Sequence, residues 1–366
     1  MLFLIRRDDI IPNLQATVSV IEKKQTIPIL SNVFLKTEGN ALLMIGTDLE
    51  IQLATKIPVD VHREGQTTIS ARKFFDVCRN LPNDSVLRIE LKENQVVISS
   101  GRSRFQIATL DPDNYPSFSF SGYDIEFDIE GNKFFKLLQS TSFCMATQDV
   151  RYYLNGLMIE INGQKLGAVA SNGHRLALCN ECLDKTSNAN TQIIIPRKAV
   201  MELLRLLDKE DHSYFKMRIS TSDIELSLDG TVFLSKLIDG KYPDFKGVLS
   251  QNVAKNFVMK TSEFQCALNR VSVLSHVKFR KITLEFTTNR LIVRTDNNEQ
   301  EQAVEEIDIV YSGEYFEVSL NVTYLLEAIN NIFNETVDIS FTDRTNICLI
   351  RNPANPEIKY VVMPLV

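Results

Sequence analysis

One pattern occurs three times along the 366 residues, and this repetition constrains the fold more than any other feature. Thr47, Ser171 and Thr295 recur at an interval of 124 residues, and Lys73, Lys198 and Thr323 recur at an interval of 125. An apolar triplet with steps of 7 and then 4 residues opens each repeat: Phe3, Ile10, Leu14; Phe127, Phe134, Leu138; Phe257, Phe264, Leu268. Self-similarity at a fixed period indicates related structural units. We therefore predict three domains, at residues 1–122, 123–252 and 253–366.

Each repeat is itself composed of two copies of a smaller unit. In the first repeat, Ile10, Leu14 and Val18 lie four residues apart, which predicts a helix with one apolar face. A second helix is predicted from residue 72 to about residue 81, with Ser70 as its N-cap. Short apolar runs bounded by turn residues predict strands around both helices. The order gives a doubled βαβββ module in each domain, so the predicted fold class is α+β.

The last seven residues, YVVMPLV (360–366), are apolar although chain ends usually fray into solvent. They stand where the closing strands of the first two repeats stand, so we expect them to form the closing strand of the third. Pro364 cannot donate a backbone hydrogen bond and should mark the end of that strand. Beyond it, Leu365 and Val366 are expected to find no further strand to join.

The composition is typical of a globular protein, with 44% hydrophobic and 23% charged residues. The apolar run at the start is shorter than that of an export signal, and no run approaches the length of a membrane span. Six scattered cysteines suit reduced thiols, so we expect a cytoplasmic location. A net charge of −6 argues against a protein that binds nucleic acid through its overall charge.

The sequence gives little support for catalysis or metal binding. Cys179 and Cys182 form a lone C-x-x-C motif near His174, but a structural zinc site wants four ligands. We therefore predict two ordinary cysteines, no metal and no cofactor. The carboxylates of Asp48 and Asp296 fall at equivalent places in their repeats, which indicates turns rather than an active site. A hydrolase or nuclease on a repeated scaffold is the alternative to a binding protein without catalytic activity.

Nine short motifs, in order along the whole chain, resemble the bacterial DNA polymerase III beta subunit, the sliding clamp. They are GTDLE (46–50), ARKFFD (71–76), SGRSRF (100–105), QDVRYYLNG (148–156), NGHRLAL (172–178), PRK (196–198), DGKYPDF (239–245), KFR (278–280) and YVVMP (360–364). The resemblance implies a non-catalytic processivity factor of DNA replication. It also implies the clamp fold as a ring-shaped, head-to-tail homodimer, with helices lining a hole through which double-stranded DNA passes.

The resemblance implies a set of DNA-facing residues on the inner helices and in the QDVRYY loop. They are Lys24, Arg72, Lys73, Arg79, Gln148, Arg151, Tyr152, Tyr153, Arg197 and Lys198. Basic contacts of this kind are to phosphates and carry no sequence information. A lysine on a helix is also typical of a solvated surface, and Tyr152 or Tyr153 could equally belong to the core. Lys133 and Lys136 are further basic candidates.

The resemblance also implies that the first domain of one copy contacts the third domain of the other. The matching residues are Lys73, Arg102, Arg104, Phe105, Val273, Leu274, Glu299, Glu301 and Glu305. Surface ion pairs are each worth about 0–1 kcal/mol, so we expect Phe105, Val273 and Leu274 to contribute more than the charged residues. The charges could instead serve solubility alone.

A groove for short hydrophobic peptides beside the C-terminus is the last implied site. The matching residues are Leu154, Ser171, Gly173, His174, Arg175, Leu176, Pro243, Val248, Asn321, Tyr324, Val361, Met363 and Pro364. The implied partners are the DNA polymerase III alpha subunit, the clamp loader delta subunit, other polymerases and mismatch-repair proteins. Leu365 and Val366 would form the lip of the groove. Ser171 and the ending PLV depart from many relatives, which bears on how tightly partners bind.

Overall fold

The computed structural model describes residues 1–22, 27–116, 118, 120, 122–184, 190–207, 213–228, 230–343 and 345–365. The chain divides into two compact units, which are Met1–Asn132 with Met201–Leu237, and Lys133–Val200 with Ile238–Val366. This division differs from the three domains predicted from the repeats, so the boundaries at 1–122, 123–252 and 253–366 stay a prediction. Within the described residues, no helix is long and apolar enough to cross a lipid bilayer.

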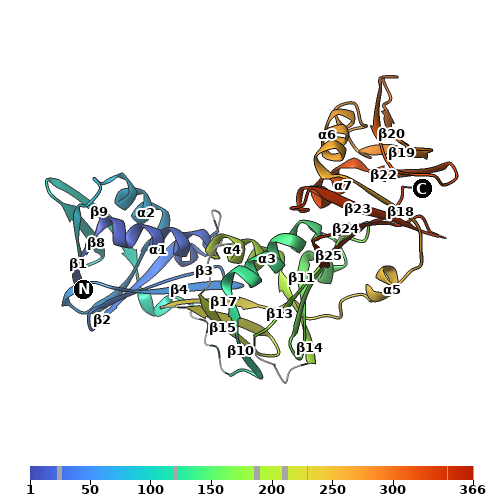
Figure 1. The fold of residues 1–366 in the computed structure, drawn as a ribbon. Coiled ribbons are helices and arrows are strands. Elements are labelled where there is room, and N and C mark those ends of the chain that lie inside the picture. Colours follow the sequence, from blue (N-terminus) through green and yellow to red (C-terminus); the bar gives the residue numbers. More distant parts are fainter. Residues whose placement is uncertain are drawn as a thin grey trace. The chain divides into compact units, whose positions relative to one another are not determined.

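The predicted module is present in each of the three repeats (Figure 1). The first contains β1 (Leu2–Arg6), α1 (Arg7–Ser19), β2 (Asn32–Glu38), β3 (Ala41–Thr47), β4 (Ile51–Pro58), β5 (Asp60–Arg63), β6 (Gly65–Ser70), α2 (Ala71–Asn80), β7 (Val86–Lys92), β8 (Gln95–Ser100) and β9 (Ser103–Leu110). The second contains β10 (Ile125–Glu130), α3 (Gly131–Thr141), β11 (Gly156–Asn162), β12 (Lys165–Ser171), β13 (Arg175–Cys182), β14 (Asn190–Pro196), α4 (Arg197–Leu206), β15 (Tyr214–Ile219), β16 (Asp223–Leu228) and β17 (Thr231–Lys236).

The third repeat follows the short helix α5 (Lys246–Leu249). It contains β18 (Val253–Lys260), α6 (Thr261–Ser272), β19 (Lys281–Thr287), β20 (Arg290–Asp296), β21 (Gln302–Asp308), β22 (Phe316–Asn321), α7 (Val322–Asn330), β23 (Thr336–Thr342), β24 (Cys348–Asn352) and β25 (Asn355–Val362). Short 3₁₀ helices in the described residues are η1 (Pro28–Ser31), η2 (Pro112–Asn114), η3 (Ser142–Cys144) and η4 (Tyr152–Asn155). The doubled βαβββ module and the α+β class are confirmed, with β5 and α5 as additions.

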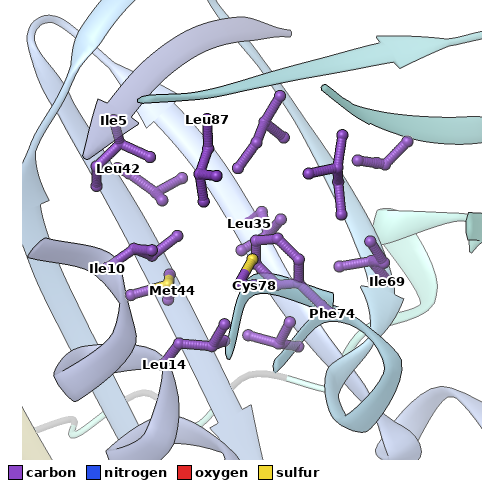
Figure 2. Close-up of a cluster of buried hydrophobic side chains, with 14 of the residues drawn as sticks. Ile5, Ile10, Leu14, Leu35, Leu42, Met44, Ile69, Phe74, Cys78 and Leu87 are labelled. Carbon is purple, nitrogen blue, oxygen red and sulfur yellow. The ribbon is translucent and has the colours of Figure 1, made fainter. Parts of the chain in front are cut away.

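In the first unit, thirteen strands form one sheet in the order β10-β15-β16-β17-β4-β3-β2-β6-β9-β8-β7-β1-β5. The pair β17–β4, with Thr231 opposite Thr55, joins strands of the second repeat to those of the first. Helices α1 and α2 cover one face of the first repeat's strands. Figure 2 shows Ile10 and Leu14 of α1, with Phe74 and Cys78 of α2, directed at strand residues between helices and sheet.

In the second unit, the order of the larger sheet is β14-β11-β12-β13-β25-β24-β23-β18, and a second sheet has the order β21-β20-β19-β22. The pair β13–β25, with Leu176 opposite Val361, joins the second repeat to the third. The apolar triplets found in the sequence are buried in all three repeats. The repeated pattern therefore records the packing of each repeat's first strand and first helix.

Two of the three repeated hydroxyl residues, Thr47 and Ser171, close turns between strands, whereas Thr295 bonds to the neighbouring strand β19. The Thr47 hydroxyl donates to the carbonyl of Ile51 at 2.8 Å, and the Ser171 hydroxyl donates to that of Arg175 at 2.7 Å. Thr295 donates instead to the carbonyl of Lys281, at 2.6 Å. The carboxylate of Asp48 accepts from two backbone N–H groups of its turn, as predicted. Ser70 occupies the N-cap position of α2, as predicted, but its side chain makes no capping hydrogen bond.

The C-terminal residues form the predicted closing strand and then continue to a different sheet. β25 ends at Val362, before Pro364. The Met363 N–H donates to the His174 carbonyl at 2.9 Å, and the Leu365 N–H donates to the Ser319 carbonyl of β22 at 2.8 Å. The expectation that Leu365 has no strand to join is therefore wrong. Val366 lies outside the described residues.

Candidate functional site

The apolar residues of the predicted groove come together in one part of the second unit. We call the following set the groove cluster: Ala146, Leu154, Met158, Val169, Leu176, Leu178, Ile194, Tyr242, Phe245, Ile347, Leu349 and Val361. Val248 and Met363 pack against it and are half-buried. Pro243 is exposed, and it follows Tyr242 in the segment that ends at Phe245. The sequence motif DGKYPDF pointed to this segment, but Tyr242 and Phe245 were not named as groove residues.

The turn between β12 and β13 supplies three more predicted groove residues. Ser171 holds the turn through its hydroxyl, which also accepts from the Gly173 N–H at 3.1 Å. Gly173 has φ +86°, and a Cβ there would lie 2.8 Å from a guanidinium nitrogen of Arg151. The positive φ favours glycine here, whereas the Arg151 guanidinium is the end of a flexible side chain and could move aside for a Cβ. His174 is exposed, and its carbonyl holds the backbone of Met363.

Arg175, another predicted groove residue, packs against α7. Only 10% of its side chain is exposed, and its guanidinium lies over the ring of Tyr324, 4.5 Å from the centroid. It donates to the Phe143 carbonyl at 2.5 Å and forms an ion pair with Glu327 of α7. Burial lowers the pKa of Arg175. The guanidinium is thus already bonded on two sides, and it links β13 to α7.

The beginning of α7 brings Asn321 and Tyr324 to the same region. The Asn321 side chain caps the helix by accepting from the N–H groups of Thr323 and Tyr324. Glu327, one turn beyond Tyr324, was not predicted as a site residue. No sequence signal identified it, because its role depends on a partner 152 positions away.

The QDVRYY loop is held by an ion pair of its own. Asp149 accepts from the backbone N–H, Nε and Nη2 of Arg151, at 2.8, 3.0 and 2.9 Å. The hydrogen bonds from the Arg151 side chain and backbone lower the pKa of Asp149 to about 2. Gln148 is exposed, and Tyr152 is 57% exposed. Tyr153 packs against the groove cluster, so the two tyrosines of this loop differ in their surroundings.

The predicted DNA-facing cations differ in how far their charges are already neutralised. Arg72 and Lys73 of α2 are exposed and make no hydrogen bond or ion pair with any described residue. Arg79 lies 3.5 Å from Asp76 and over the ring of Phe75. Arg197 donates to the Met145 carbonyl.

The remaining cations of this set are less informative. Lys198 is half-buried and has interactions of its own. Lys133 and Lys136 are paired with Asp184 and Glu181. Lys24 lies outside the described residues.

Two strand edges carry the predicted dimer residues. β9 pairs with β8 from Ser103 to Ala108, but with β6 only at Thr109 and Leu110. The other edge of its first half is therefore open within the described chain. It carries the exposed Arg104 and Phe105, next to the exposed Arg102.

β21 ends the four-stranded sheet, and among the described strands it pairs only with β20. Near it, Val273 is 77% exposed and Leu274 is half-buried. Glu299 and Glu301 are exposed, whereas Glu305 is bound by Arg270 at 2.7 Å. Lys73, the remaining predicted dimer residue, is exposed on α2.

The C-x-x-C motif does not form a site with two equivalent thiols. Cys179 is buried and Cys182 is exposed, and both are free. Burial raises the pKa of the Cys179 thiol to about 12, so this thiol is protonated at neutral pH. Among the described residues, no group of three or more His, Cys, Asp or Glu side chains could hold a metal ion.

Models of the DNA polymerase III beta subunit match almost the whole chain. Its N-terminal domain matches residues 1–119, its central domain residues 128–244 and its C-terminal domain residues 246–366. The chain belongs to this family. It is 38% identical to the beta sliding clamp of Pseudomonas aeruginosa and 36% identical to that of Escherichia coli, in each case over 366 residues and 100% of both chains.

Solved clamp structures agree with this membership. A Pseudomonas aeruginosa clamp bound to griselimycin has a TM-score of 0.96 and 38% identity, covering 100% of this chain and 99% of that one. The Caulobacter crescentus clamp has a TM-score of 0.93 and 31% identity, covering 100% of both chains. The clamp fold and the function of a sliding clamp in DNA replication, a processivity factor and not an enzyme, follow from the family, as the resemblance predicted.

Proposed function

We propose that two copies of this chain close into a ring around duplex DNA in the cytoplasm. The observation that carries this proposal is the pair of open strand edges, on β9 and β21. An open edge exposes unpaired backbone groups, and natural proteins usually cover or protect it. Arg102 and Arg104 beside one edge and Glu299 and Glu301 beside the other have opposite charge. A two-fold axis then buries each edge of one copy against the other edge of its partner.

Apolar contacts should stabilise this interface more than its ion pairs do. Val273 is 77% exposed, so its apolar side chain is left largely uncovered by the described part of one copy. Replacing Val273 and Leu274 together by alanine should shift the mass in solution from dimer to monomer. Val150→Ala, at a residue that is 96% exposed in the QDVRYY loop, is the matched control. An unchanged dimer in the double variant would refute this interface.

We infer that DNA is held by enclosure and touched lightly by the cations of the inner helices. Arg72 and Lys73 support this proposal best, because neither has a partner among the described residues. Arg79, Arg197 and Lys198 contribute further charge, Gln148 and Tyr152 are exposed in their loop, and Lys24 is proposed from the family alone. Arg151 contributes less, because Asp149 offsets its charge. A sliding protein needs contacts that are weak, sequence-independent and sensitive to salt.

We further infer that the groove cluster and the C-terminal residues bind short hydrophobic peptides of partner proteins. The partners we propose are the DNA polymerase III alpha subunit, the clamp loader delta subunit, other polymerases and mismatch-repair proteins. The half-buried Val248 and Met363 at the edge of a buried apolar cluster support this role. Binding sites of this kind are mostly apolar with a few polar groups that orient the ligand. A relative, the Pseudomonas aeruginosa clamp, was solved with a bound ligand, griselimycin.

Removing residues 364–366 tests the groove without removing a strand residue, since β25 ends at Val362. The truncated protein should lose affinity for a fluorescein-labelled hydrophobic peptide from the cognate alpha subunit, measured by fluorescence anisotropy. Its mass in solution should stay that of a dimer. Unaltered peptide affinity would show that the tail is no part of the site.

A further inference from the structure

A cavity of about 360 Å³ directly adjoins the groove cluster. Leu178, Phe245 and Leu249 line this cavity and also belong to the groove cluster or pack against it. The remaining wall is polar and includes three lysines, Lys165, Lys246 and Lys359. We call this cavity the lysine pocket. Members of the groove cluster thus form part of the wall of a basic cavity.

The strand register explains this arrangement. Leu176 pairs with Val361 across β13 and β25, and Leu178 pairs with Lys359. Side chains two residues apart on a strand point to the same face of the sheet. Lys359 therefore lies on the face that carries Val361, one step further along the strand. Lys165 lies on that same face of β12, four residues before Val169 of the groove cluster.

The lysine pocket has more positive than negative charge. Its one carboxylate, Glu160, accepts from Lys246 Nζ at 3.0 Å and from Gln192 Nε2 at 2.9 Å. The charge of Lys246 is therefore already balanced. Lys165 acts on Glu160 only through a longer-range electrostatic attraction, and neither Lys165 nor Lys359 forms a hydrogen bond or ion pair with a residue of the described chain. Two ammonium groups beside a cavity remain available for an anionic ligand.

We propose that the lysine pocket is an additional anchor for clamp-binding peptides, and that it takes an acidic side chain flanking their hydrophobic segment. The proposal rests on the peptide groove of the proposed function. A ligand that fills the apolar groove must leave it at one end, and the lysine pocket begins at Leu178 and Phe245. An Asp or Glu placed there meets Lys165 and Lys359, whereas an apolar or basic residue gains nothing. Partners that share the same hydrophobic segment would therefore differ in affinity according to the charge of its flanking residues.

The experiment compares peptides that differ only in their flanks. Fluorescein-labelled peptides share the hydrophobic segment of the cognate alpha subunit and carry two Glu or two Gln residues at the N-terminal or the C-terminal end. Their affinities for the full-length dimer are measured by fluorescence anisotropy at low salt. At one of the two ends, Glu should bind about fivefold more tightly than Gln, as expected for two partly screened ion pairs. The gain should shrink as salt is raised.

Two variants of the protein decide whether the lysine pocket causes the gain. The gain should disappear in Lys165→Gln/Lys359→Gln, while the affinity of the Gln-flanked peptide stays unchanged. It should persist in Lys36→Gln/Lys56→Gln, which loses the same charge on β2 and β4. Equal binding of Glu and Gln flanks at both ends, or a gain that survives in the Lys165/Lys359 variant, overturns the proposal.

Two further outcomes separate this proposal from its alternatives. If neither peptide binds the wild type at all, the groove itself is wrong. In the second outcome, the peptides bind the groove while the Lys165/Lys359 substitutions weaken only the binding of a labelled single-stranded oligonucleotide. In that case the pocket binds phosphates, and the peptide proposal is wrong.

Discussion

Helices α2 and α7 occupy equivalent places in the first and third repeats, but their exposed faces differ. Both bury an apolar face, through Phe74 and Cys78 in α2 and through Leu325 and Ile329 in α7. The exposed face of α2 carries Arg72 and Lys73, which have no partner in the described part of the chain, whereas α7 has no basic residue. Instead, Tyr324 and Glu327 of α7 bind the buried Arg175.

After duplication, the buried face of a helix stays the same in each repeat, whereas its exposed face can change. The buried face of each helix is fixed by packing against its own sheet, so its pattern recurs in every repeat. The exposed face makes no such contact and is free to acquire a different function. In α2 that function is positive charge, which we assign to DNA and the dimer edge. In α7 it is the link between two repeats, to which we assign the support of the proposed peptide groove.

The largest expected effect comes from breaking the link between α7 and β13. Arg175→Ala leaves Glu327 without its partner and removes the cation that lies over Tyr324. Losing such a pair costs about 3 kcal/mol, near the lower end for buried pairs because Glu327 can still reach water. Peptide affinity, measured by anisotropy, should fall by as much as about 100-fold, although the guanidinium of Arg175 is already bound to Phe143 and Glu327 within the protein.

Arg175→Lys is the matched control, because it keeps the charge but loses the planar group that bonds on two sides. It should recover part of the affinity. If Arg175→Ala binds the peptide as tightly as the wild type, the link does not support the groove.

The dimer edge should show the next largest effect. Phe105→Ala removes an aromatic anchor from the open half of β9. Truncating a central aromatic residue in an interface commonly costs about 2 kcal/mol, or about 30-fold in the dissociation constant. Analytical ultracentrifugation should show this weakening at a given concentration. A dimer as tight as the wild type would exclude the open edge of β9 from the interface.

The free cations of α2 should change the salt dependence of DNA binding. For a short linear duplex, each phosphate contact contributes about one unit to the slope of log affinity against log salt. Arg72→Gln/Lys73→Gln should therefore lower that slope by about two.

The control for this measurement is Lys36→Gln/Lys56→Gln. Lys36 neighbours the buried Leu35 on β2 and so points to the opposite face of the sheet, away from α1 and α2. This variant should leave the slope unchanged. An equal effect of both variants would mean that overall charge, rather than the face of α2, binds the DNA.

The smallest effect concerns Asp149, whose pair with Arg151 contrasts with the unpaired cations of α2. Its pKa in the folded protein, about 2, lies below the ordinary value of 3.8. The stabilisation of the loop is therefore complete above about pH 4 and is lost as the pH falls toward 2. An NMR titration of the Asp149 carboxylate should give a midpoint near 2 and a normal value in Arg151→Gln. A midpoint near 3.8 in the wild type would show that Arg151 is free after all.

The sequence predicted the repeated module because each buried triplet leaves a periodic pattern. The turn roles of Thr47 and Asp48 could also be predicted from the sequence, because their hydrogen bonds join residues close together in the chain. The burial of Arg175 was not, because its partner Glu327 is distant in the sequence. The contact of Leu365 with Ser319 also depends on how two sheets lie within the second unit. Periodicity shows which face is buried, but not which distant residue covers it.

The central claim is that this protein stays on DNA because two copies enclose it. The most direct measurement loads the protein onto nicked circular duplex with the clamp loader and ATP, and follows retention by gel filtration before and after the circle is cut at one site. The account predicts that the dimer stays on the circle and leaves the linear product within the time of the experiment. Equal retention on circular and linear DNA, or retention of a single copy, would contradict it.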